Sequence, residues 1–173
     1  MLRQTAPVLA GSDLVDAERQ LGRAPRSLVG VAARCPFGRP AVLVQAPYDG
    51  QGAPFPTIYW LSCPTLVQAV GRFEAAGGIA TLTAELAGDP ELARDLAVVE
   101  RRVIDARARL AAPGPRLDGG EALRAGIAGE APGGGLKCLH AHVATALANP
   151  PYRLGLLALE RAGATYPAAC CLE

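Results

Sequence analysis

The chain has 173 residues, half of them hydrophobic and 19% charged, which is the composition of one folded domain rather than of a disordered chain. Its formal net charge of +1 gives no overall attraction to nucleic acid or to an acidic membrane surface. No apolar segment approaches the ~20 residues that cross a bilayer, and no secretory signal is recognisable, so we expect a cytoplasmic protein without a membrane segment.

Residues 12–63 are expected to hold one helix and a small sheet. The helix begins after Ser12 and has apolar residues at helical spacing on one face, namely Leu14, Ala17 and Leu21. Three strands are expected over residues 27–34, 41–46 and 57–62. The third, TIYWLS, is the strongest because it is rich in β-branched and aromatic residues.

Residues 64–163 are expected to be mainly helical. Helices are predicted over residues 65–76, 79–86, 90–110, 136–148 and 153–161. Asp89 as N-cap with Pro90 in the first turn marks the start of the longest one. The glycine-rich segment 113–135 is expected to be a loop, and residues 164–173 a tail. We therefore predict a single α+β domain, residues 1–173, in which a small, mainly antiparallel N-terminal sheet of about three strands packs against a larger helical layer.

Five cysteines and two histidines carry most of the potential chemistry. Cys35 and Cys63 each end a predicted strand and precede a proline. If the three strands form a meander, the first and third run parallel, so both thiols are expected at the same end of the sheet. Both histidines lie in the run KCLHAH at 137–142. Cys170 and Cys171 stand near the C-terminus and are interpreted as a frayed tail or a peripheral thiol pair.

A metal centre is the leading interpretation of these residues. In a reducing compartment cysteines serve as ligands, nucleophiles or packing rather than as disulfides. Cys138 is expected near a helix start, which favours a thiolate, and His142 shares its helix face while His140 points roughly opposite. We predict Cys35, Cys63, Cys138 and His142 as metal ligands, with His140 as the second choice for the fourth. The three thiolates suit either zinc or a [4Fe–4S] cluster with an open position.

These cysteines and histidines suggest three competing functions. In the first, the metal centre is catalytic, and Lys137 and His140 orient the substrate or transfer a proton. In the second, a closed zinc site stabilises a non-catalytic module that binds a small molecule or a protein partner. In the third, Cys138 is the nucleophile of a metal-free thiol enzyme, with His142 as its base. Simple packing is the alternative to all three, because cysteines are often buried for that reason alone.

Three motifs in fixed order, RCPFGRPAVLVQAPY, PFPTIYWLSCP and GGGLKCLHAHVATALA, resemble the bacterial family called domain of unknown function 501, which is common in actinobacteria. The similarity covers roughly residues 14–163, and Cys170 and Cys171 lie outside it. The matching residues are Cys35, Pro36, Gly38, Pro56, Tyr59, Trp60, Cys63, Pro64, Lys137, Cys138, His140 and His142. The resemblance implies a bacterial cytosolic protein and supplies no activity.

Overall fold

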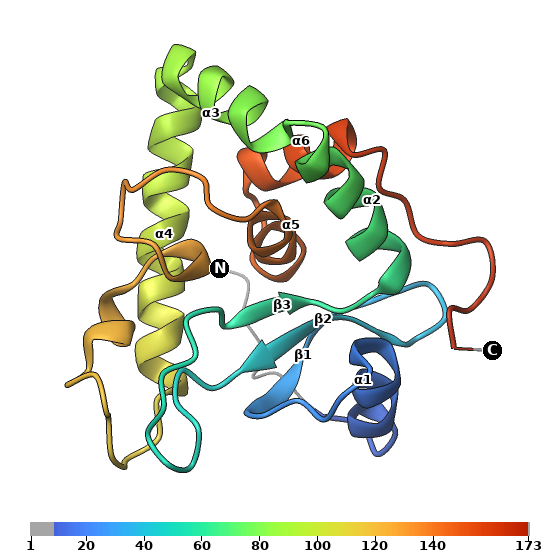
Figure 1. Ribbon diagram of the computed structural model, residues 1–173, viewed down its shortest axis with the longest axis vertical. Helices are drawn as coiled ribbons and strands as arrows, with labels where there is room; N and C mark the ends of the chain where they lie inside the picture. Colours follow the sequence, from blue (N-terminus) through green and yellow to red (C-terminus); the bar gives the residue numbers. More distant parts are fainter. Residues whose placement is uncertain (1–8, 173) are drawn as a thin grey trace.

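A three-stranded antiparallel sheet lies near the N-terminal end of the chain (Figure 1). The structure is a computed structural model that describes residues 9–172. The strands are β1 (Leu28–Arg34), β2 (Pro40–Gln45) and β3 (Tyr59–Leu61), in the order β1-β2-β3. The central strand β2 is buried along its whole length, because the sheet is covered on both faces. The predicted α+β fold with a small N-terminal antiparallel sheet is therefore confirmed.

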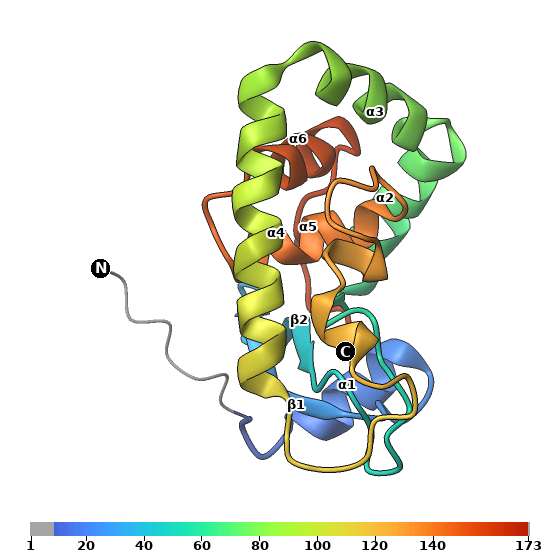
Figure 2. The ribbon, with the colours of Figure 1, turned by 90° about the vertical axis from the view of Figure 1, so that its left-hand side faces the viewer.

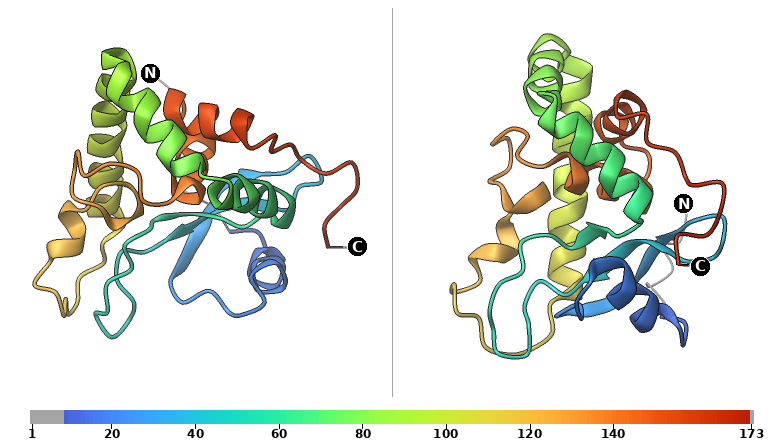
Figure 3. Two further views of the ribbon diagram at one scale, coloured as in Figure 1. Left: turned by 45° about the horizontal axis from the view of Figure 1, so that its top comes forward. Right: turned by 45° about the vertical axis from the view of Figure 1, so that its right-hand side comes forward.

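Helices cover the two faces of the sheet unequally. The helices are α1 (Asp13–Leu21), α2 (Pro64–Ala75), α3 (Gly78–Gly88), α4 (Pro90–Leu110), α5 (Leu139–Ala148) and α6 (Arg153–Arg161). Figure 3 shows α1 on one face of the sheet and the other helices on the opposite side. The longest, α4, runs along one flank of the molecule (Figure 2). Within residues 9–172, no helix combines the length and the apolar character needed to cross a membrane.

The contact between α1 and the sheet is partly ionic, which the sequence did not predict. On the predicted apolar face Ala17 is fully buried, but Leu14 is 53% exposed. Asp13 and Asp16 are buried instead and bind Arg34 and Arg39, with N–O distances of 2.7 and 2.9 Å. The two ion pairs rotate α1 so that its carboxylates, rather than its leucine, face the strands.

The helix α5 forms the centre of the fold. It packs on β3 and beneath α6, and most of its side chains are buried. A helix that is apolar on all sides is stable only when other elements surround it. It begins at Leu139, three residues later than predicted, because Cys138 is extended and occupies the N-cap position. This late start places Cys138 and His140 at the exposed end of an otherwise buried helix.

The segment between α4 and α5 was predicted to be a loop, and it contains two short 3-10 helices, Glu121–Arg124 and Ile127–Gly129. The fully buried Arg107 of α4 fixes this segment to the loop before β3. Its guanidinium donates to the carbonyl oxygens of Pro56 at 2.5 Å and Gly126 at 3.1 Å. Burial lowers the pKa of Arg107 to about 10.

Candidate metal centre

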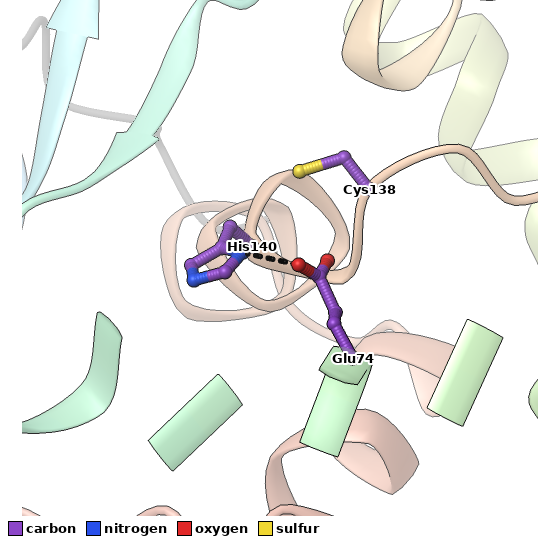
Figure 4. Close-up of side chains that lie close together, drawn as sticks. All are labelled: Glu74, Cys138 and His140. Carbon is purple, nitrogen blue, oxygen red and sulfur yellow. Dashed lines mark ion pairs between the residues drawn. The ribbon is translucent and has the colours of Figure 1, made fainter. Parts of the chain in front are cut away.

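Three side chains of metal-binding type converge where the end of α2 meets the start of α5. They are Glu74, Cys138 and His140, and one potential ligand atom from each lies within 4.8 Å of the other two. Figure 4 shows the carboxylate, the sulfur and the imidazole turned toward the same space. In the part of the chain that the structure describes, this is the one group of three Cys, His, Asp or Glu residues that meets this distance.

One polar atom of His140 and one of Glu74 each contact a backbone group. His140 Nε2 lies 3.0 Å from the carbonyl oxygen of Val67, and His140 Nδ1 lies 3.1 Å from Oε2 of Glu74. The second carboxylate oxygen, Oε1, accepts a hydrogen bond from the backbone N–H of Leu139. Each side chain is thus oriented through one polar atom while its other polar atom faces the cluster. Metal-binding histidines and carboxylates are commonly fixed in this way.

Cys138 and His140 shift each other's pKa values within the cluster. Burial alone would raise the pKa of the Cys138 thiol, but hydrogen bonds to His140 and to the Ala141 amide outweigh it, so the pKa is lowered. The hydrogen bond with Cys138 raises the pKa of His140 to about 9, helped by Val67 and Glu74 and opposed by burial. Both imidazole nitrogens face hydrogen-bond acceptors, which requires a proton on each. In the metal-free cluster an imidazolium therefore lies beside a thiol of lowered pKa and the side chain of Glu74.

The cluster is accessible from solvent. Cys138 is half-buried, and the side chains of Glu74 and His140 are 22% and 26% exposed. Lys137 immediately precedes Cys138, and its side chain is 64% exposed. Its ammonium lies 3.1 Å from a carboxylate oxygen of Glu130. The cluster is therefore partly open to solvent.

Residues 31–159 match a family model described as a protein of unknown function, DUF501. The chain belongs to the DUF501 family. The match contains the whole Glu74–Cys138–His140 cluster together with Cys35 and Cys63, and it ends before Cys170. No curated protein and no solved structure matches the chain.

The DUF501 chain does not gather the four metal ligands that were predicted from its sequence. His142 is 2% exposed and lies in the core, with Nδ1 2.5 Å from the Tyr152 hydroxyl. Burial lowers the pKa of His142 to about 4, so this imidazole is neutral at pH 7. Cys63 is the N-cap of α2, whereas Glu74 lies in its last turn, about 16 Å farther along the helix. Cys35 is buried on the Cys63 side, away from Cys138.

Glu74 is the member of the cluster that sequence reasoning missed in this DUF501 chain. A weak signal for it was present. Glu74 lies in the last turn of α2, where the helix dipole disfavours a negative charge. A carboxylate in such a position indicates a compensating partner elsewhere in the fold, and the partners here are His140 and the Leu139 amide.

Proposed function

We propose that the DUF501 chain is a zinc-dependent enzyme whose metal is held by Glu74, Cys138 and His140. The supporting observation is the convergence of three potential ligand atoms within 4.8 Å. Two of the three side chains, Glu74 and His140, are also oriented by contacts with backbone groups. Thiolate, imidazole and carboxylate are all zinc ligands. Iron–sulfur clusters are usually held by cysteine thiolates alone, so a set with one thiolate favours zinc over a [4Fe–4S] cluster.

The number of protein ligands favours catalysis over a purely structural role. Structural zinc sites are usually closed by four side chains, whereas catalytic sites have three and keep one position for water or substrate. A zinc ion held in this way supplies Lewis acidity and lowers the pKa of a bound water to about 7. The non-catalytic binding module considered above would need a fourth ligand in addition to these three.

The residues of the chain would then divide their roles as follows. The Val67 carbonyl holds Nε2 of His140, so Nδ1, which faces Glu74, would lose its proton and bind the zinc. His140 would then be a ligand rather than a proton carrier. Lys137, the residue before Cys138, has an exposed ammonium that pairs with Glu130, and it would bind an anionic group of a substrate by exchanging that partner. A cytoplasmic location, which keeps thiols reduced, suits the use of Cys138 as a ligand.

Metal analysis of the full-length protein tests this proposal. Protein purified without chelators should contain about one zinc per chain. Glu74→Gln, Cys138→Ser and His140→Asn should each lower zinc affinity by at least ~100-fold, because each removes one of only three ligands. Cys170→Ser is the matched control, since it removes another half-buried thiol outside the cluster and should leave the zinc content unchanged. Circular dichroism of every variant separates loss of metal from loss of folding.

Cobalt substitution adds a test that does not depend on activity. The cobalt form should show a sulfur-to-metal charge-transfer band that disappears in Cys138→Ser and persists in Cys170→Ser. Iron with acid-labile sulfide after purification without oxygen would overturn the zinc assignment in favour of a cluster. Zinc that persists in all three ligand variants would place the metal elsewhere. A protein without metal would leave Cys138 and the adjacent His140 as a metal-free thiol pair.

A further inference from the structure

Cysteines from three separate segments meet at the start of β2, at the opposite end of α2 from the candidate metal centre. The backbone N–H of Cys35 donates to the carbonyl of Arg39 at 2.9 Å, and that of Cys63 to the carbonyl of Ala41 at 3.4 Å. Between them, the amide of Gln20 donates to the Pro40 carbonyl at 2.8 Å and lies 3.9 Å from the sulfur of Cys171. Cys35 and Cys63 thus bond directly to residues 39–41, and Cys171 lies near the same residues through its contact with Gln20.

The C-terminal tail reaches this place by folding back along the molecule. After α6 the chain returns to the sheet and ends beside the turn between β1 and β2 (Figures 1 and 3). Tyr166 packs against the core, and Arg19 of α1 donates to the carbonyl of Leu172 at 2.9 Å. The tail that was expected to be frayed or peripheral is therefore held against the sheet over its described residues.

The thiols of Cys63 and Cys171 interact electrostatically but differ in burial. Cys63 is fully buried. Burial raises the pKa of its thiol, and hydrogen bonds from the backbone amides of Leu66 and Thr65 oppose that rise. The sulfurs of Cys171 and Cys35 add a smaller increase. Cys171 is half-buried and so remains within reach of a small solute. The adjacent Cys170 differs, because its sulfur interacts with the guanidinium of Arg39 instead.

We propose that Cys63 and Cys171 form an oxidation site that closes into a disulfide when the protein meets a hydroperoxide. The more accessible thiol, Cys171, reacts first and becomes a sulfenic acid, while the peroxide O–O bond breaks and leaves an alcohol or water. The sulfur of Cys63 then attacks the sulfur of Cys171. The S–S bond forms, the S–O bond breaks, and the hydroxide leaves as water with the Cys63 proton. The two thiols together give two electrons to the peroxide.

The bond would join the C-terminal tail to the first turn of α2. It would tie the tail covalently to the helix that carries Glu74 at its other end. The site is separate from the Glu74–Cys138–His140 cluster and uses none of its side chains. Its existence therefore does not depend on whether that cluster binds zinc.

Peptide mapping of the oxidised full-length protein tests the proposal. The protein is treated with hydrogen peroxide, its free thiols are alkylated, and it is digested without reduction for fragmentation mass spectrometry. The wild type should yield a Cys63–Cys171 linkage with the loss of two hydrogens. Cys170→Ser, the matched control, and Cys35→Ser should yield the same linkage. In Cys171→Ser, which should keep the wild-type melting temperature, Cys63 should remain a free thiol.

Two outcomes would overturn this assignment. One is a predominant bond from Cys171 to Cys35 or to Cys170. The other is oxidation of Cys171 to the sulfinic or sulfonic state while Cys63 stays alkylatable, which would show that the buried thiol cannot reach the sulfenic acid. Zinc measured in the same Cys171→Ser sample reports on the metal centre separately, so failure of one proposal is distinguishable from failure of the other.

Discussion

The carbonyl oxygen of Val67 lies 3.0 Å from Nε2 of His140, and this contact defines the face of α2 that meets α5. Val67, Gly71 and Glu74 are four and three residues apart, so they lie on one side of the helix. Gly71 separates the two residues that bind His140. The imidazole lies over Gly71, between the Val67 carbonyl and the Glu74 carboxylate, where there is room for a methyl group but not for a large side chain.

Substitutions at Gly71 should separate helix stability from the geometry of the cluster. A Cβ atom at this position would lie 3.8 Å from Cε1 and Nε2 of His140, which is ordinary contact. Gly71→Ala should therefore keep zinc binding and gain about 0.5–1 kcal/mol of unfolding free energy, because glycine is unfavourable inside a helix. Gly71→Leu should displace the ring and weaken zinc binding by at least ~10-fold, measured by chelator competition. Equal affinity of the two variants would contradict this contact.

The role of His142 can be tested through its partner, Tyr152. Both side chains are buried, and the tyrosine hydroxyl lies 2.5 Å from Nδ1 of His142. Tyr152→Phe leaves that nitrogen without its partner, which should cost about 1–3 kcal/mol of unfolding free energy in urea denaturation. The zinc content should not change, because His142 lies outside the Glu74–Cys138–His140 cluster. Loss of zinc in this folded variant would instead return His142 to the set of ligands.

Features set by local signals were predictable from the sequence. The bounds of α4 were predicted as residues 90–110 because Asp89 is a strong N-cap, and its carboxylate does accept from the N–H groups of Glu91 and Leu92. The position of Cys35 and Cys63 at one end of the sheet was also predictable, because the three strands form the expected meander. Short connections between antiparallel neighbours leave few other topologies.

Features set by the packing of distant segments were not predictable. The helix α5 is buried on nearly all sides, so its sequence does not tell which face meets α2, and hence whether His140 or His142 joins Cys138. Glu74 comes from a helix 64 residues before Cys138 in sequence. The orientation of α1 likewise depends on Arg34 at the end of β1 and on Arg39 in the turn that follows. The helical periodicity of α1 carries no information on these two partners.

The ion pair between Asp13 and Arg34 should make the fold sensitive to acid. Hydrogen bonds from the Arg34 guanidinium hold the pKa of Asp13 below 3.8, against the opposing effect of burial. The folded state therefore favours the carboxylate, and this contribution is present above the unfolded pKa and lost as the pH falls below about 4. Asp13→Asn should cost about 1 kcal/mol at pH 7, since Arg34 is partly exposed, and should flatten the decline in stability toward pH 3.

The control for that prediction is Glu91→Gln. It removes an ion pair with Arg94 in which both side chains are about two-thirds exposed. The stability of this variant should stay within ~0.5 kcal/mol of the wild type at pH 7. Urea denaturation between pH 3 and 7 provides the comparison. An Asp13→Asn variant with the same acid profile as the wild type would show that the pair contributes nothing to acid sensitivity.

The close approach of α5 and α6 depends on Gly155. A Cβ atom there would lie 2.4 Å from the carbonyl oxygen of His142 and 2.6 Å from the Cβ of Ala146, so the two helices would have to separate. Gly155→Ala should therefore destabilise the protein by about 1–3 kcal/mol, despite the better helix propensity of alanine. Gly88→Ala is the matched control, because a Cβ at that helical position meets nothing within 4 Å and should be neutral or slightly stabilising. Urea denaturation of both variants measures the difference, and equal stabilities would show that α6 can move away from α5 at little cost.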